Sequence, residues 1–300
     1  MIVGYLYAVL AVLFWSANVI VARYFANIFT PWQISFYRWF FAAIVLLPFV
    51  MKDIYKNWSI VVKNWQIIFW LSITGIVLMN TFSYIAGKTI TAVEMSLIGV
   101  MGPVFIVILS RIFYGMKITP KQILGIIISF IGVVAIILHG KFLNLGNFKF
   151  HIGDFWMLML AFSFGVYSVI MVKRPKEISQ LTLLSLTIFL GVIIILPLFL
   201  WEVATNPVCN KWNLISVGSF VYMGIFNSIL SYLFWNLSLE KIGSLKASVI
   251  YYLMPVFSSI EAYFLLGEEI YKVQIYGGLL VILGIYLTNK HTKEVNFERP

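Results

Sequence analysis

Apolar segments of about 18 to 22 residues recur along the whole chain, and they limit its possible folds more than any other feature. Each could cross a hydrocarbon core of roughly 30 Å as a helix, and short charged or turn-forming segments separate them. Hydrophobic residues make up 62% of the chain and charged residues 11%, far from the balance of a soluble domain. The sequence therefore predicts an all-α polytopic membrane protein with ten transmembrane helices. The predicted spans are residues 3–22, 32–50, 65–86, 92–114, 121–139, 154–172, 181–201, 213–236, 245–267 and 272–289.

The start of the chain and its few reactive side chains exclude several classes of protein. The first apolar segment begins at residue 2 without a basic start or a small-residue cleavage site, so we expect a retained first span. Cys209 is the only cysteine, and the three histidines lie at span ends or in loops without metal-ligand spacing. Neither a channel filter motif nor a ring of charge is present. We therefore predict no catalytic residue, no metal and no cofactor.

The basic residues predict the orientation of the chain in the bilayer. With the N-terminus in the cytoplasm, 14 of the 21 lysines and arginines fall on the inner side, six on the outer side and Arg38 within a span. This asymmetry follows the positive-inside rule and places both termini in the cytoplasm. The net charge of +10 thus reflects topology rather than nucleic-acid binding. We predict a multi-pass protein of a bacterial cytoplasmic (inner) membrane, with a small-molecule substrate, the lipid bilayer and no nucleic acid as partners, as a monomer or homodimer.

The sequence repeats itself at an offset of 152 residues. Residues 103–132 and 255–284 share ten identities, which include a proline, two closely spaced glycines and a glycine near the end of each span. We therefore predict two halves of five helices each, residues 1–140 and 141–300. Because five is odd, the second half enters the membrane from the opposite side, as in secondary transporters that bind substrate between inverted repeats near the midplane. The glycine pairs Gly125/Gly132 and Gly277/Gly284 each lie on one helical face, where they are expected to let helices approach closely.

Pro103 and Pro255 occupy matching positions in the predicted fourth and ninth spans. A proline inside a helix removes one hydrogen bond and frees the carbonyl four residues earlier, here that of Gly99 or Tyr251. Such a loosened backbone is tolerated in a membrane where cavity water or other groups satisfy it. We interpret the pair as a pivot beside the substrate, with a simple packing kink as the alternative.

Glu261 is an acid inside the predicted ninth span, six residues after the proline. Intramembrane carboxylates usually face the bundle interior or water, so Glu261 could attract a cationic group or carry a proton. Its counterpart in the first half is Leu109, so the repeat itself does not require the acid. The alternative is an interfacial acid paired with Lys272 or another base. Glu268, at the end of this span, is expected to be a surface acid.

Three further charged residues are candidates for coupling or charge sensing. Arg38 lies seven residues into the second span and could recognise an anion, unless it snorkels or is paired for structural reasons. Glu94 completes the segment Thr91-Ala-Val-Glu94, which alternatively is only a capping box at the start of a span. Lys88 falls on the same predicted helical face as two uncharged polar residues of the third span.

Polar and aromatic stripes on spans three and eight predict a substrate site. Asn80, Tyr84 and Lys88 follow a spacing of four residues, and a second stripe repeats this spacing in span eight. Amides, hydroxyls and aromatic rings suit a polar organic solute that has shed its water, although interhelical hydrogen bonds worth about 1 kcal/mol each are an alternative. Residues of spans one and six are included because those spans are symmetry mates. The predicted substrate-binding residues are Trp15, Asn18, Asn80, Tyr84, Tyr167, Asn227, Ser231, Trp235 and Tyr251.

A series of motifs resembles the EamA-type branch of the drug/metabolite transporter superfamily over nearly the whole chain. The motifs are FWSANVIVAR (14–23), FYRWFFAAIVLLP (36–48), YIAGKTITA (84–92), LAFSFGVYSVIMVKR (160–174), SLEKIG (238–243), MPVFSSIEAYFLLGEE (254–269) and YGGLLVILGIYL (276–287). The resemblance implies a ten-helix carrier with a central cavity lined by both repeats. It implies no particular substrate, because the superfamily handles amino acids, purines, nucleotide sugars and cationic drugs.

The predicted function is secondary transport of a small polar metabolite, with an amino-acid-like solute as the first choice, by alternating access. The many aromatic residues and amides, with few buried charges, favour this substrate class, and the resemblance alone favours export. The alternatives are efflux of a lipophilic cation and transport of a nucleoside- or purine-like solute. A membrane-embedded enzyme or a channel is the alternative of a different class.

Overall fold

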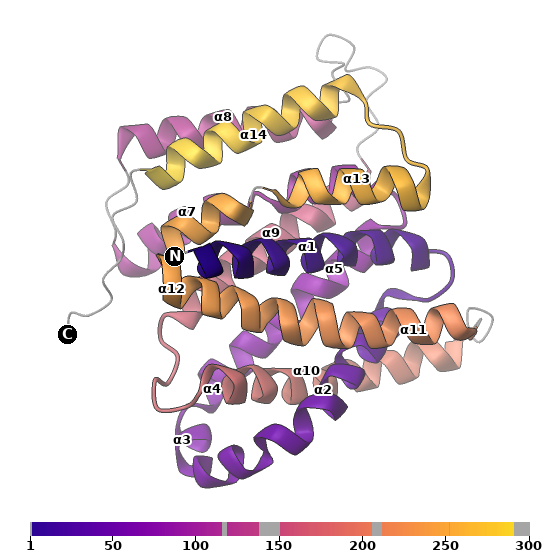
Figure 1. Ribbon diagram of the computed structural model, residues 1–300, viewed down its shortest axis with the longest axis vertical. Helices are drawn as coiled ribbons and strands as arrows, with labels where there is room; N and C mark the ends of the chain where they lie inside the picture. The colour runs from indigo at the N-terminus through magenta and orange to yellow at the C-terminus, as the bar shows by residue number, and fades with distance from the viewer. Residues whose placement is uncertain (1, 116–118, 138–150, 206–211, 252, 291–300) are drawn as a thin grey trace.

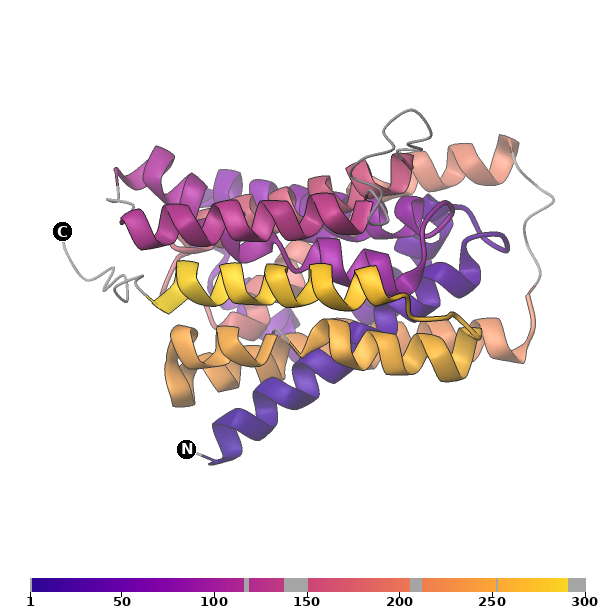
Figure 2. The same cartoon turned by 90° about the horizontal axis from the view of Figure 1, so that it is seen from above.

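A computed structural model describes residues 2–115, 119–137, 151–205, 212–251 and 253–290. Every regular element in these ranges is a helix, and most of the helices run along one shared direction (Figures 1 and 2). In chain order the elements are α1 (Ile2–Phe25), α2 (Pro31–Lys56), α3 (Trp58–Lys63), α4 (Trp65–Leu71), η1 (Ser72–Leu78), α5 (Met79–Ala86), α6 (Ala92–Gly99), α7 (Gly102–Tyr114), α8 (Pro120–Ile137), α9 (Ile152–Met171), α10 (Gln180–Thr205), α11 (Leu214–Tyr222), η4 (Met223–Leu230), α12 (Ser231–Tyr251), α13 (Met254–Leu266) and α14 (Lys272–Lys290).

The described part of the chain contains seven helical runs that are long and apolar enough to cross a membrane. Three shorter apolar helices cover residues 120–136, 254–266 and 272–284. Large apolar side chains are exposed on the outside of the bundle, such as Phe49 on α2, Phe130 on α8 and Phe264 on α13. An apolar exterior of this extent suits contact with lipid tails rather than water. These observations agree with the predicted all-α, multi-pass membrane architecture.

One predicted span boundary is wrong, and one predicted span contains a break. Residues 214–251 form one continuous helical run through α11, η4 and α12, so the expected break between residues 236 and 245 is absent. The predicted fourth span matches the apolar run Ala92–Tyr114, but it consists of two helices, because α6 ends at Gly99 and α7 begins at Gly102. Pro103 and Pro255 therefore lie in the first turn of α7 and α13, where a helix does not need the N–H group that proline lacks. Each proline begins a new helix rather than kinking a continuous one.

Helices α7 and α13, which begin beside the two prolines, match each other closely. Both α7 and α13 have 13 residues, and each ends at a glycine in the left-handed conformation. Gly115 has a φ of 64° and Gly267 a φ of 67°, values that favour glycine over residues with a side chain. The π-helices η1 and η4 also lie at nearly the same position in the two repeats. The repeat in the sequence is thus accompanied by repeated local structure.

Helices α8 and α14 lie side by side and run antiparallel (Figure 1). A Cβ atom at Gly132 would lie 2.7 Å from the carbonyl oxygen of Gly277, and one at Gly284 would meet the carbonyl oxygen of Gly125. Gly125 corresponds to Gly277 in the repeat, and Gly132 to Gly284, so each helix presents the same glycine face to its counterpart. The contact is therefore related by a local two-fold axis, and the close helix approach expected at these glycines is present.

Helices α2 and α10 also form an antiparallel pair, with a carboxylate at each end. Glu202 near the end of α10 accepts hydrogen bonds from Thr30 Oγ1 and from the Trp32 N–H at 3.2 Å, at the start of α2. Asp53 near the end of α2 accepts one from Thr182 Oγ1 at 3.5 Å, at the start of α10. A negative charge is favourable at a helix N-terminus, so each helix caps the other.

Candidate functional site

Arg38 of α2 is a charged side chain in the interior of the bundle, and only 1% of it is exposed. Its Nε donates to a serine hydroxyl at 2.7 Å, and its Nη2 donates to a backbone carbonyl at 3.1 Å. Three side-chain oxygens lie between 2.6 and 2.9 Å from its Nη1. The partners are Ser228 Oγ, the Asn227 carbonyl, Asn18 Oδ1, Asn80 Oδ1 and Tyr84 Oη.

All of these partners are neutral. An ion pair joins Arg23 and Glu268, and among the described residues no carboxylate pairs with Arg38. The guanidinium is therefore well hydrogen-bonded but carries a charge that no acid among the described residues balances. A buried charge is costly unless an opposite charge compensates it, so this site favours an anion that arrives from outside the protein.

The two π-helices position partners of Arg38. Asn80 Nδ2 donates to the Gly75 carbonyl in η1 at 3.0 Å, and Ser228 Oγ donates to the Met223 carbonyl in η4 at 2.9 Å, in each case five residues earlier. A π-turn interrupts the regular α-helical pairing, and such turns are frequent at functional sites. In both cases the side chain that donates to the π-helix, Asn80 or Ser228, also accepts a hydrogen bond from Arg38.

The amide of Asn227 joins η4 to α1. Its oxygen faces the Asn18 N–H at 3.1 Å and its nitrogen faces the Phe14 carbonyl at 2.5 Å, in the orientation that satisfies both groups. Ser231 Oγ donates to the Asn227 carbonyl at 2.6 Å. The predicted site residues Asn18, Asn80, Tyr84, Asn227 and Ser231 thus lie together around Arg38.

A group of aromatic rings adjoins this polar centre, since Trp15 precedes Asn18 by about one turn of α1. The Trp15 ring lies 5.4 Å from Trp235 and 6.2 Å from Tyr251, measured between ring centroids. Tyr251 in turn stacks on Phe164 of α9 at 6.1 Å with an interplanar angle of 9°. The structure therefore brings together three more of the predicted residues, in an arrangement suited to an apolar or cationic group.

One predicted site residue lies at the edge of this centre and another lies elsewhere. Tyr167 of α9 packs against η1, where a Cβ atom at Gly75 would lie 2.5 Å from its ring, and it interacts electrostatically with Tyr232. Lys88 is exposed and follows the end of α5 at Ala86, so it is not on the helical face that carries Asn80 and Tyr84. The stripe predicted from the spacing of four residues is therefore corrected: it stops at Tyr84.

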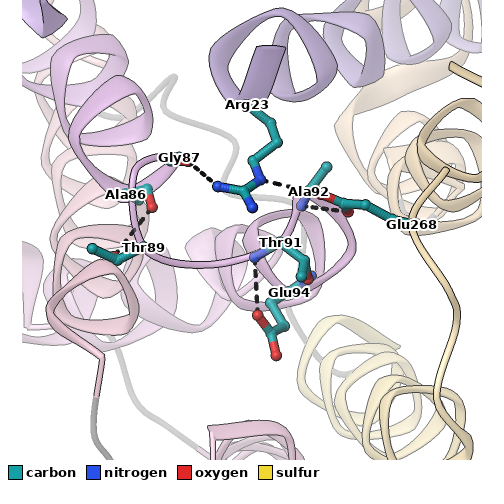
Figure 3. A network of polar contacts seen from close by, with 8 residues as sticks. All are labelled: Arg23, Ala86, Gly87, Thr89, Thr91, Ala92, Glu94 and Glu268. Atoms are coloured by element: carbon teal, nitrogen blue, oxygen red, sulfur yellow. Dashed lines mark hydrogen bonds and ion pairs between the residues drawn. The ribbon is translucent and has the colours of Figure 1, made fainter. Parts of the chain in front are cut away.

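An ion pair joins segments that are far apart in the sequence. Arg23 Nε at the end of α1 lies 3.2 Å from Glu268 Oε1, just after α13 (Figure 3). Arg23 Nη1 also donates to the Gly87 carbonyl at 2.8 Å, and the Ala92 N–H donates to Glu268 Oε2 at 2.9 Å. The side chain of Glu268 is only 12% exposed, so the prediction of a surface acid is wrong. Glu268 instead ties α13 to α1 and to the first turn of α6.

Glu94 lies beside this network as part of a helix cap (Figure 3). The Thr91 N–H donates to Glu94 Oε2 at 3.0 Å, and the Glu94 N–H donates to Thr91 Oγ1 at 3.2 Å. This reciprocal pair is the capping box that the sequence offered as an alternative. A part for Glu94 in coupling remains a prediction.

Glu261 of α13 touches α1. Its Oε1 lies 2.9 Å from Ser16 Oγ, while its Oε2 is buried and has no hydrogen-bond partner. Lys272, the base suggested as its partner, forms no ion pair with it. The interfacial pairing considered from the sequence is therefore absent from the described part of the chain.

Sequence reasoning missed several residues that the structure brings to these contacts. They are Arg23, Glu202, Ser228 and Tyr232, the last of which packs its ring 5.4 Å from Trp15. Ser228 follows a predicted site residue directly, but its place on a π-turn rather than an α-turn is what aims it at Arg38. The described residues contain no group of three or more histidine, cysteine or acidic side chains that could hold a metal ion.

Apolar helices of membrane-spanning length around a buried polar centre define a multi-pass integral membrane protein. The chain belongs to the EamA-like transporter family, which matches it over residues 2–138 and again over residues 151–290. Family membership and the names of its relatives point to a transporter rather than an enzyme.

Similar proteins cover most of the chain. It is 28% identical to an uncharacterized transporter of Archaeoglobus fulgidus, over 93% of this chain and 94% of that one. It is 26% identical to a probable terminal-alkyne amino-acid exporter of Streptantibioticus cattleyicolor, over 66% of this chain and 64% of that one. A solved crystal structure with 17% identity covers 95% of both chains at a TM-score of 0.64, which shows a shared fold.

Proposed function

We propose that this chain is a secondary transporter that exports a small amino-acid-like metabolite across the cytoplasmic membrane by alternating access. The observation that carries the substrate class is Arg38, a buried cation whose partners on the chain are all neutral. A carboxylate on the substrate would supply the missing negative charge. A guanidinium binds carboxylates through parallel hydrogen bonds, which gives orientation as well as affinity.

The surroundings of Arg38 fit the rest of such a solute. Amide and hydroxyl groups of Asn18 and Tyr84 offer hydrogen bonds to a polar backbone, and they already lie beside the guanidinium. The rings of Trp15, Trp235 and Tyr251 provide a nearby surface for an apolar side chain or an ammonium group. The same rings favour a second candidate, efflux of a lipophilic cation, in which Arg38 would only hold helices together.

The proposed architecture is ten spans in two inverted halves, residues 1–140 and 141–300, with both termini in the cytoplasm. The reciprocal antiparallel contacts of α8 with α14 and of α2 with α10 support this arrangement, since each pairs a helix with its own counterpart. A substrate site between two such halves can face either side of the membrane in turn. Tag-accessibility mapping would contradict this topology if it placed residues 141–151, which lie largely outside the described ranges, in the cytoplasm.

Export is proposed because the family resemblance favours it and because one relative bears the name of an amino-acid exporter. Purified protein in liposomes, loaded with a mixture of amino acids, tests substrate class and saturation together by counterflow. We expect saturable exchange of amino acids that is inhibited by other α-amino carboxylates but not by the matching amino-acid amides. Arg38→Gln should abolish this exchange, while Lys63→Gln, at an exposed position, should leave it intact. Transport of lipophilic dyes without any response to carboxylates would refute the proposal and favour the cation reading.

A further inference from the structure

We propose that Glu261 is a proton-binding site between the two halves, protonated while α13 is closed against α1 and deprotonated when they part. The inference rests on the proposed function, because it assigns the acid a part in alternating access.

The hydrogen bonds at Ser16 require one more proton than the serine carries. Ser16 Oγ lies 2.7 Å from the Leu13 carbonyl and 2.9 Å from Glu261 Oε1, and both of these oxygens can only accept if Glu261 is ionised. A serine hydroxyl has a single hydrogen, so an ionised Glu261 would leave one contact without a proton. A protonated Glu261 donates to Ser16 Oγ, which in turn donates to Leu13. The neutral acid thus satisfies both contacts of Ser16 Oγ.

Among the described residues, no basic side chain pairs with Glu261 to compensate a negative charge. Its Oε2 is buried without a partner, and a buried carboxylate oxygen in that condition is far more costly than a neutral carbonyl oxygen. The nearest elements are α1 and α6, whose charged groups are already engaged: Arg23 pairs with Glu268, and Glu94 caps its own helix. Tyr222 of α11 also interacts electrostatically with Glu261 and is neutral at ordinary pH.

The corresponding contact in the other half is apolar. Leu109 of α7 takes the place of Glu261 at the offset of 152 residues. Gly165 of α9 takes the place of Ser16, because the first helices of the two halves align from Gly4 and Gly153, at an offset of 149 residues. A Cβ atom at Gly165 would lie 3.1 Å from Leu109 Cδ1, so these two helices pack at the equivalent point without any polar group. Helix packing at this point therefore does not need an acid. The second half has one, and the first half has a leucine at the corresponding position.

Separation of α1 and α13 would expose this carboxyl to water, where an acid ionises readily at neutral pH. Closing the contact again would require a proton. The contact therefore takes up one proton each time it closes and releases one each time it opens. A low pH on the side from which the contact closes should thus favour closure, which makes net flux depend on pH.

Labelling of the wild-type protein tests the proton site without any substrate. A hydrophobic carbodiimide adds to protonated carboxyl groups in apolar surroundings, and peptide mapping by mass spectrometry locates the adduct. In liposomes between about pH 5 and about pH 9, we expect labelling at Glu261 to fall about tenfold for each pH unit above its midpoint. The exposed Glu269 should remain unlabelled throughout. Absence of an adduct at Glu261 over the whole range, or an adduct whose yield ignores pH, would overturn the proposal.

A matched pair of variants tests coupling. Glu261→Gln keeps the size and the hydrogen bond to Ser16 but cannot titrate, so it should retain substrate counterflow and lose the pH dependence of net flux. Glu269→Gln makes the same chemical change at an exposed site and should keep the wild-type pH profile. An unaltered pH dependence of net flux in the Glu261→Gln variant would refute the coupling role, even if the carboxyl is labelled. Failure of amino-acid transport with normal labelling at Glu261 would refute the substrate class and leave the proton site standing.

Discussion

Replacing Glu268 with glutamine tests whether the ion pair with Arg23 keeps one end of the bundle closed. In the proposed topology this end faces the outside, and the pair links a helix of the first half to one of the second. A glutamine can still accept the hydrogen bond from the Ala92 N–H, which Glu268 accepts at 2.9 Å. The variant therefore removes a charge while it keeps the side-chain shape and the cap of α6.

The expected effect follows from the two electrostatic contributions that are lost. The ion pair has a separation of 3.2 Å but the arginine side chain is 33% exposed, so solvent limits its worth to about 1 kcal/mol or less. The negative charge at the N-terminus of α6 contributes about 0.3–1 kcal/mol more. A total of about 0.5–2 kcal/mol corresponds to a shift of roughly 2- to 30-fold toward the state that is open at this end.

Accessibility of a buried cysteine measures this shift. With Cys209 replaced by serine, a cysteine at Ile90 would be the only thiol, and Ile90 is 2% exposed between the bonded segments. The rate of modification by a membrane-impermeant maleimide should rise roughly 2- to 30-fold in the Glu268→Gln variant. Glu269→Gln is the control, and it should leave the rate unchanged. Equal rates in the Glu268→Gln and wild-type backgrounds would show that the ion pair does not hold this end closed.

The remaining predictions concern binding, movement and packing. Arg38→Lys should raise the KM for a carboxylate substrate in counterflow by roughly 10- to 100-fold, because the ammonium keeps the charge but cannot form the bidentate hydrogen bonds of a guanidinium. An unchanged KM would rule out direct recognition of the carboxylate by Arg38. Alanine at both Pro103 and Pro255 should slow turnover more than it weakens binding, since it stiffens the joins where α7 and α13 begin, and wild-type turnover would end the pivot hypothesis. Gly132→Leu should destabilise the protein by about 1–3 kcal/mol in thermal unfolding, because its side chain would collide with α14. The same change at Gly218, where nothing lies within 4 Å, should have little effect, and equal losses at both sites would contradict this view of the packing.

Hydropathy and internal repetition together predicted much of the fold. The repeat at 152 residues anticipated that α7 and α13 would match, down to the glycine that ends each helix. The capping box at Thr91 was readable because its partners are three residues apart. These features depend on short stretches of sequence, where spacing alone decides which groups can meet.

The missed features depend on contacts that no short stretch contains. The partner of Arg23 is 245 residues away, and nothing in the sequence around either residue marks the pair. Hydropathy also indicates where an apolar segment ends rather than where a helix ends. It therefore predicts a break at the polar residues 238–243, although α12 continues through them. Asn18, Asn80, Tyr84 and Asn227 were chosen for their chemistry, and the structure gathers them around Arg38; their part in binding stays a prediction.

The π-helices make the site tolerant of a change in the number of residues. A widened turn in η1 accommodates an extra residue without lengthening the helix appreciably, so the helix beyond it keeps its rotation. Deleting one residue from 72–78 would let the segment return to an ordinary α-helix and would leave Asn80 and Tyr84 facing Arg38. The deletion would also remove the widened turn whose Gly75 carbonyl accepts the hydrogen bond from Asn80 Nδ2. We therefore expect a deletion here to yield a protein that still inserts into the membrane and gathers its polar centre, but that holds Asn80 less firmly.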